Sequence, residues 1–227
     1  MQRGRTDPGA DEKGSRSPSA LQERDIPGEN VYWEVTMEGF PKGSLRAVHN
    51  RTVSVTTYEA ENDCVIVEGV LKDKRLVDTY SVTSGEKMPP GVVHDLAVRI
   101  TVRGPEMRII DVAVDMKHVP RDDCMRMRES LVPLIGQSVA PGFTQWVKSR
   151  LGGKRGCTHL NALVIAMAPA VLQGFWNARA ARHMSIREAA KGISPEYLID
   201  TCWVWRSEGP LAEELRSFLN RKEVTDR

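Results

Sequence analysis

Hydrophobic and polar residues alternate along much of the chain between residues 31 and 116. The alternation is clearest over residues 52–57, 76–82, 96–102 and 110–116, and a β-branched run covers residues 64–71. A period of two is typical of strands that bury one face. Turn-forming residues follow three of these segments, at 61–63, 89–91 and 103–105. No helical pattern intervenes, so we expect an antiparallel meander and not a parallel sheet with crossover helices.

The pattern changes to a helical period after residue 120. Pro120, followed by two aspartates, predicts a helix that runs to about Ile135. A second predicted helix begins between Ser138 and Pro141 and ends at residues 152–153. A third begins near Cys157 and should be kinked at its internal proline, residue 169. The apolar stripe of this third helix comprises Leu160, Leu163, Val164, Met167, Val171 and Phe175.

The two ends of the chain have different characters. Residues 1–28 contain almost no large apolar side chains, which predicts a disordered tail. A capping box at residues 185–188 predicts a short helix that ends at Gly192, and Pro210 begins a last helix over residues 211–220. The apolar segment 198–205 should pack against the core. We therefore expect one α+β domain over residues 29–205, with a C-terminal helix in 206–227. In this domain, an antiparallel sheet of about six strands is expected to pack against about three helices.

Composition excludes several classes of protein. The chain has 227 residues, 41% hydrophobic and 27% charged, which suffices for a sizeable core. The formal net charge is only +2, without the clustered basic excess of a nucleic-acid-binding surface. Residues 162–172 form the longest apolar stretch, too short for a membrane span. The first residues lack the apolar core of a signal peptide, so we expect a cytoplasmic protein with reduced cysteines.

Candidate chemistry gathers at the expected element starts. Cys124 and Cys157 each stand at the beginning of a predicted helix, where thiolates are stabilised. His159 follows Cys157 by two residues, and His94-Asp95 stands at a strand start. Cysteine and histidine together suit a zinc or iron site.

Other chemistry-bearing residues have simpler interpretations. Cys64 and Cys202 are expected in the core, because cysteine is among the most buried residue types. His118 and His183 lie in polar contexts and are expected to be solvated, and Asp73 is expected in a turn. A further pair, His49 and Arg51, points to one face of a strand; it either binds an acidic group or forms a solvated edge.

Several of these segments, taken in order, resemble a bacterial family catalogued as domain of unknown function 2889. They are His49-Asn50-Arg51, the segment from Val67 to Asp73, His94-Asp95-Leu96, Cys124, Leu151-Gly152-Gly153, Gly156-Cys157-Thr158-His159-Leu160 and the segment from Leu198 to Cys202. The resemblance covers about residues 45–205 and implies no activity. Residues 71–74 read Leu-Lys-Asp-Lys, which departs from the family pattern and leaves the role of Asp73 open.

A more distant resemblance of layout links residues 94–175 to iron–sulfur scaffold proteins of the NifU/IscU type. It implies a NifU/IscU-like core in which His94 or Asp95 takes the place of an acidic ligand, and Cys124 and Cys157 take the places of two cysteines. The first scaffold cysteine has no counterpart, and the scaffold's His-Cys pair is replaced here by Cys-x-His. A mononuclear zinc or iron site suits this set better than a transferable cluster.

Two functions from different classes follow. The first is a lyase- or hydrolase-type metalloenzyme that acts on a small anionic or acyl substrate. Its ligands would be His94, Cys124 and Cys157, with His159 as a ligand or acid/base, and with Asp95, His49 and Arg51 among the catalytic and anion-holding candidates. In a version of this hypothesis without metal, Cys157 is the nucleophile and His159 is its base. This requires residue 157 to lie outside the helix.

The second function is an iron–sulfur or metal carrier without catalysis. A third possibility is a structural subunit in which all four cysteines are buried. The partners expected for the enzyme are a small-molecule substrate and, for its assembly, a second copy in a homodimer; no nucleic acid or membrane is expected.

Overall fold

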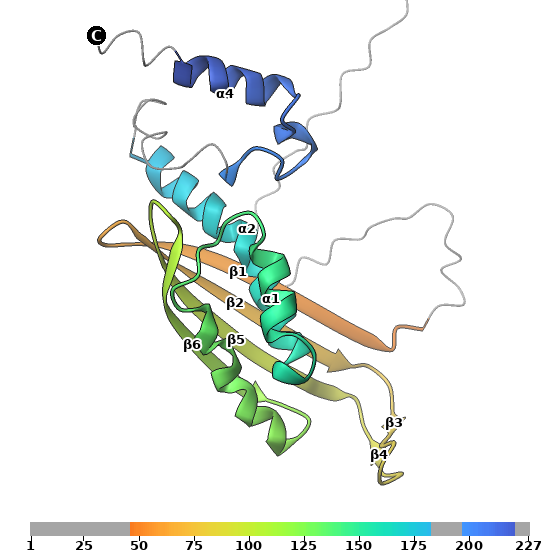
Figure 1. Cartoon of the computed structure of the whole chain (residues 1–227). Coiled ribbons are helices and arrows are strands. Elements are labelled where there is room, and N and C mark those ends of the chain that lie inside the picture. Colours follow the sequence, from red (N-terminus) through yellow and green to blue (C-terminus); the bar gives the residue numbers. More distant parts are fainter. Residues whose placement is uncertain (1–45, 183–196, 221–227) are drawn as a thin grey trace, which may run out of the picture. The chain divides into compact units, whose positions relative to one another are not determined.

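The structure, a computed structural model, describes residues 46–182 and 197–220 (Figure 1). Its main feature is a four-stranded antiparallel sheet with the strand order β1-β2-β5-β6, in which each long strand pairs with the next long strand along the chain. The strands are β1 (His49–Ala60), β2 (Cys64–Arg75), β5 (Gly91–Arg103) and β6 (Arg108–His118). The α+β class and the antiparallel meander are therefore confirmed. The tail expected at 1–28, the helix expected at 185–192 and His183 lie outside the described residues.

The expected six-stranded sheet is wrong in its size. Residues 76–82 contribute only β3 (Thr79–Tyr80), which pairs with β4 (Lys87–Met88) in a separate two-stranded sheet. The apolar residues of this segment have nothing to cover, since Leu76 is 41% exposed and Val82 is fully exposed. Alternation over so few residues marks a pleated backbone, but without a core face it does not add a strand to the main sheet.

The helices follow in the expected order. The first, η1 (Asp122–Leu134), lies where a helix to about Ile135 was expected; it is a 3₁₀-helix and contains Pro133. The second, α1 (Phe143–Leu151), is followed by a single 3₁₀ turn, η2 (Gly153–Arg155). The third, α2 (Thr158–Ala180), is the longest helix and contains Pro169.

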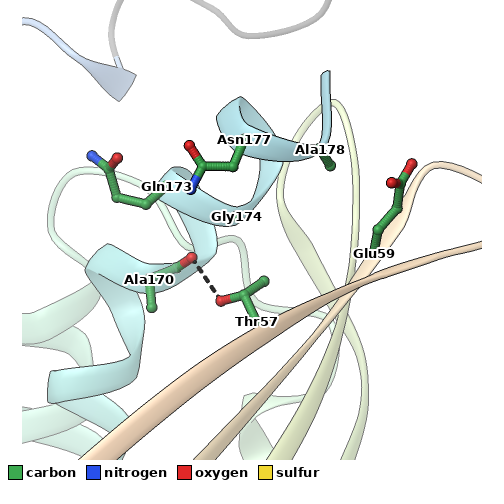
Figure 2. Close-up of a pocket in the computed structure, with 7 residues that line it drawn as sticks. All are labelled: Thr57, Glu59, Ala170, Gln173, Gly174, Asn177 and Ala178. Carbon is green, nitrogen blue, oxygen red and sulfur yellow. Dashed lines mark hydrogen bonds between the residues drawn. The ribbon is translucent and has the colours of Figure 1, made fainter. Parts of the chain in front are cut away.

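Helix α2 packs on one face of the sheet through the predicted stripe. All six stripe residues are buried, as are the β-strand residues Val67, Leu71, Leu96, Val98 and Ile100 that face the helices. Two glycines let the helix approach closely: a Cβ on Gly69 would lie 2.7 Å from Met167 Sδ, and one on Gly174 would lie 2.2 Å from Thr57 Cγ2. Thr57 also donates a hydrogen bond of 3.1 Å to the Ala170 carbonyl, beside an open hollow between β1 and α2 that polar and apolar residues line together (Figure 2).

Length and composition alone would allow α2 to cross a membrane. However, Leu160, Leu163, Val164, Met167 and Val171 are completely buried. The core helix of a soluble protein passes the same test, and the packing of these residues on the sheet accounts for the buried part of the apolar surface of α2, 39% of the window concerned.

The C-terminal part that the structure describes contains η4 (Trp203–Trp205) and α4 (Pro210–Asn220). The expectation that residues 198–205 pack against the core holds only in part. Leu198 is buried, but Cys202 is exposed and Trp203 is 78% exposed. The expectation of a core position for Cys202 is therefore wrong, whereas Cys64 is 7% exposed and lies in the core as predicted.

Candidate functional site

Strand register brings three polar side chains together at one end of the sheet. Asp73, near the end of β2, pairs in register with Arg51 of β1 and with His94 of β5. All three side chains point to the face that the helices cover, because they share the alternation of buried residues such as Leu71. The first turn of α2 lies over the same end and contributes His159.

Asp73 is the centre of this cluster. It is 2% exposed, and both of its carboxylate oxygens accept hydrogen bonds from Arg51, at 2.6 Å from Nε and 2.7 Å from Nη2. This two-point pair with Arg51 is the main cause that lowers the pKa of Asp73, and it outweighs the opposing effect of burial. Asp73 is therefore a buried, ionised carboxylate near neutral pH.

Three histidines surround the same carboxylate. His94 Nδ1 lies 3.1 Å from Asp73 Oδ2, His159 Nε2 lies 3.6 Å from that oxygen, and His49 Nε2 lies 3.4 Å from Oδ1. The rings of His94 and His159 are neighbours, with centroids 3.8 Å apart. Burial is the largest cause that lowers the pKa of both of these histidines, and the nearby Arg51 guanidinium lowers it further. Both imidazoles are therefore neutral near pH 7, the state in which histidine binds metals.

Cys157 lies beside His159. It is the N-cap of α2, with an extended backbone (φ −96°, ψ 126°), so it stands outside the helix. Its Sγ is 3.7 Å from His159 Nδ1. Because the other ring nitrogen of His159 faces Asp73, the residues form a chain in the order Cys157, His159, Asp73.

The structure thus brings together five of the seven residues singled out from the sequence: His49, Arg51, His94, Cys157 and His159. It does not bring the other two to the cluster. Asp95 pairs with Lys72 at 2.9 Å, and strand alternation places both on the opposite face of the sheet. Cys124 lies in η1 and packs against the core.

The central residue, Asp73, was assigned to a turn, and this assignment is wrong. It lies within β2, with the pair to Arg51 compensating its burial. A signal was present in the sequence: Val67, Leu71 and Asp73 share one parity in the strand, so the aspartate occupies a core-facing position.

Three of these residues suit a metal ion. Asp73, His94 and His159 offer ligand atoms that all lie within 4.8 Å of one another. Bonds of about 2.1 Å place neighbouring ligands roughly 3.4 Å apart in a tetrahedron and 3.0 Å apart in an octahedron. The distances of 3.1 and 3.6 Å from Asp73 Oδ2 to His94 Nδ1 and His159 Nε2 are close to these spacings, and the first of them is also the length of a direct hydrogen bond between His94 and the carboxylate. Within the described ranges no cysteine belongs to such a group.

Comparison with known proteins gives a family and no activity. A search of curated proteins and a search of solved structures found no match. One protein-family model matches residues 49–173, a segment that begins at His49 and contains every residue of the cluster. The chain therefore belongs to the family described as "Protein of unknown function (DUF2889)".

Proposed function

We propose that the protein is an enzyme with one zinc or iron ion held by Asp73, His94 and His159, and that it acts as a lyase or hydrolase on a small anionic substrate. The observation that supports this most directly is the convergence of one carboxylate and two neutral imidazoles from three different elements within 4.8 Å. Burying an ionised aspartate and two imidazoles together is costly unless they serve one another or a ligand.

The donor set favours zinc or iron. Imidazole nitrogen with one carboxylate suits both ions, and three protein ligands leave a position for a substrate. Such an ion supplies Lewis-acid activation of water or of a carbonyl group. The protein itself provides orientation: His159 Nδ1 faces the Cys157 sulfur, so that contact fixes which nitrogen faces Asp73.

This proposal changes the ligand set expected from the sequence. Cys157 contacts the ring nitrogen of His159 that faces away from Asp73, and Cys124 lies elsewhere. Asp73 replaces them as a ligand. The proposal retains two expectations from the sequence, namely that the protein is cytoplasmic and that its substrate is a small molecule. The alternative, a carrier with a NifU/IscU-like core, remains a prediction, and it depends on a cysteine-ligated cluster.

Metal content tests the proposal. Protein purified without chelator should contain about one zinc or iron ion per chain, since coordination by pre-arranged ligands survives purification. His94→Ala and His159→Ala should lose the ion, whereas the matched control Cys124→Ser should keep it, and Cys157→Ser should weaken its binding without abolishing it, because Cys157 only orients His159. Loss in the cysteine variants with retention in His94→Ala would contradict the ligand set. Absence of any ion in the wild type, also after incubation with zinc or ferrous iron, would refute the proposal.

One observation favours a second candidate, a thiol enzyme without metal. Residue 157 lies outside the helix, which is the condition for its sulfur to reach His159. Cys157 would then be the nucleophile, His159 the base and Asp73 the group that orients the base. Residue-resolved alkylation by iodoacetamide separates the two: this candidate requires Cys157 to react faster than Cys124, and to lose that advantage in His159→Gln.

A further inference from the structure

Arg51 donates hydrogen bonds to the Asp73 carboxylate, which is also a ligand of the proposed metal ion. Oδ2 of Asp73 accepts from Arg51 Nη2 at 2.7 Å, and the same oxygen faces His94 at 3.1 Å and His159 at 3.6 Å. A guanidinium and a divalent cation would share one negative charge. Since like charges at this distance in a partly buried site repel strongly, the two cations compete for Asp73.

Of the two partners, Arg51 is the one that can move. The Asp73 side chain is 3% exposed and held within β2, whereas the Arg51 side chain is 40% exposed on the edge strand β1. Among the described residues, Nη1 of Arg51 has no hydrogen-bond partner, and Asp73 accounts for the bonds of Nε and Nη2. The neighbouring His49 side chain is 52% exposed, so this side of the cluster is open to solvent.

We propose that the site binds its divalent cation and a small oxyanion cooperatively, because the cation takes Asp73 and leaves the Arg51 guanidinium for the anion. This inference rests on the proposed metal site and adds the class of substrate. The planar fork of arginine matches the two oxygens of a carboxylate or a phosphate. Without the cation, the anion must displace a buried carboxylate that is already in place. When the cation is bound, Asp73 no longer neutralises Arg51, and the anion can take its place as the counter-charge.

Thermodynamic linkage makes the coupling measurable from either side, since each ligand must raise the affinity of the other by the same factor. The assay is zinc affinity by competition with a chromophoric chelator, with and without propionate or methylphosphonate. In the wild type, one of these anions should tighten zinc binding by about 5- to 150-fold, the usual range for coupled sites. A response to propionate alone indicates a carboxylate substrate, and a response to methylphosphonate alone indicates a phosphate.

Variants of Arg51 test whether its guanidinium weakens or strengthens zinc binding. Arg51→Gln removes the competing charge, so zinc should bind more tightly than in the wild type without anion, and the response to anion should disappear. Arg51→Lys keeps the charge without the fork and should retain a smaller response. Arg99→Gln is the control, because Arg99 pairs with Glu68 at 2.8 Å on the opposite face and should behave like the wild type.

Two results would overturn the inference while the metal site stands. One is weaker zinc binding in Arg51→Gln, which would make Arg51 a support for Asp73 and not a competitor. The other is an unchanged anion response in that variant. If neither the wild type nor Arg51→Gln binds zinc, the metal site and the coupling both fail. Thermal unfolding checks the fold of Arg51→Gln, and zinc should raise its melting temperature more than that of the wild type.

Discussion

Two aspartates on adjacent strands, Asp73 and Asp95, provide a direct test of which face carries the site. We predict that Asp73→Asn lowers the free energy of unfolding far more than Asp95→Asn. The Asp73 carboxylate accepts two charge-assisted hydrogen bonds from Arg51, at 2.6 and 2.7 Å, from a position that is 2% exposed. The Asp95 carboxylate forms one ion pair with Lys72, whose side chain is 38% exposed.

The two environments set the magnitudes. A hydrogen bond to a charged group contributes about 1.5–3 kcal/mol. Because Arg51 is partly exposed, water replaces part of the hydrogen bonding that it loses in Asp73→Asn. We therefore expect this variant to lose about 2 kcal/mol of unfolding free energy in total. An exposed pair such as that of Asp95 contributes about 0–1 kcal/mol. For a chain of this size, about 2 kcal/mol corresponds to a fall of roughly 4–8 °C in melting temperature.

Urea unfolding at pH 7 in the presence of a chelator, followed by tryptophan fluorescence, measures both variants without any contribution from metal. The pH dependence adds a second check. Because the pKa of Asp73 is lower in the folded protein, its contribution is complete above the unfolded value of about 3.9 and is lost as the pH falls through the folded value. Equal losses in the two variants, or a neutral Asp73→Asn, would refute the assignment of Asp73 as the centre of the cluster.

Two further predictions concern packing and protonation. Gly174→Ala should destabilise the protein by about 1–3 kcal/mol through the clash with Thr57 Cγ2, and Thr57→Ser should relieve part of this loss in the double variant. The control Gly91→Ala, with nothing within 4 Å of the added Cβ, should have little effect in the same urea titration. The lowered pKa values of His94 and His159 mean that the unfolded chain takes up protons first, so stability without metal should fall as the pH drops below about 6.5. Replacing both histidines by glutamine should flatten this dependence of the urea midpoint; an unchanged slope would contradict the burial of the two rings.

The sequence predicted those features that depend on local periodicity. Alternation identified the four long strands, and the spacing of Leu160, Leu163 and Met167 identified the buried face of α2. It also indicated five of the site residues, because cysteine and histidine at element starts have the chemistry of ligands and nucleophiles, and His49 and Arg51 share one face of a strand. It failed at residues 76–82, where alternation occurs without a core to cover, and at residues 122–134 it predicted a helix without distinguishing a 3₁₀-helix from an α-helix.

What the sequence by itself determined was the face on which each side chain lies, and only the tertiary structure decided which side chains meet. Asp73 lies between two lysines, and although it shares the strand parity of Leu71, no local property identifies the residues that it meets on the core-facing side. Its burial is stabilised by Arg51, 22 residues earlier, and by His94, 21 residues later. The register of three strands and the docking of α2 set these contacts, and both depend on interactions between segments far apart in the chain.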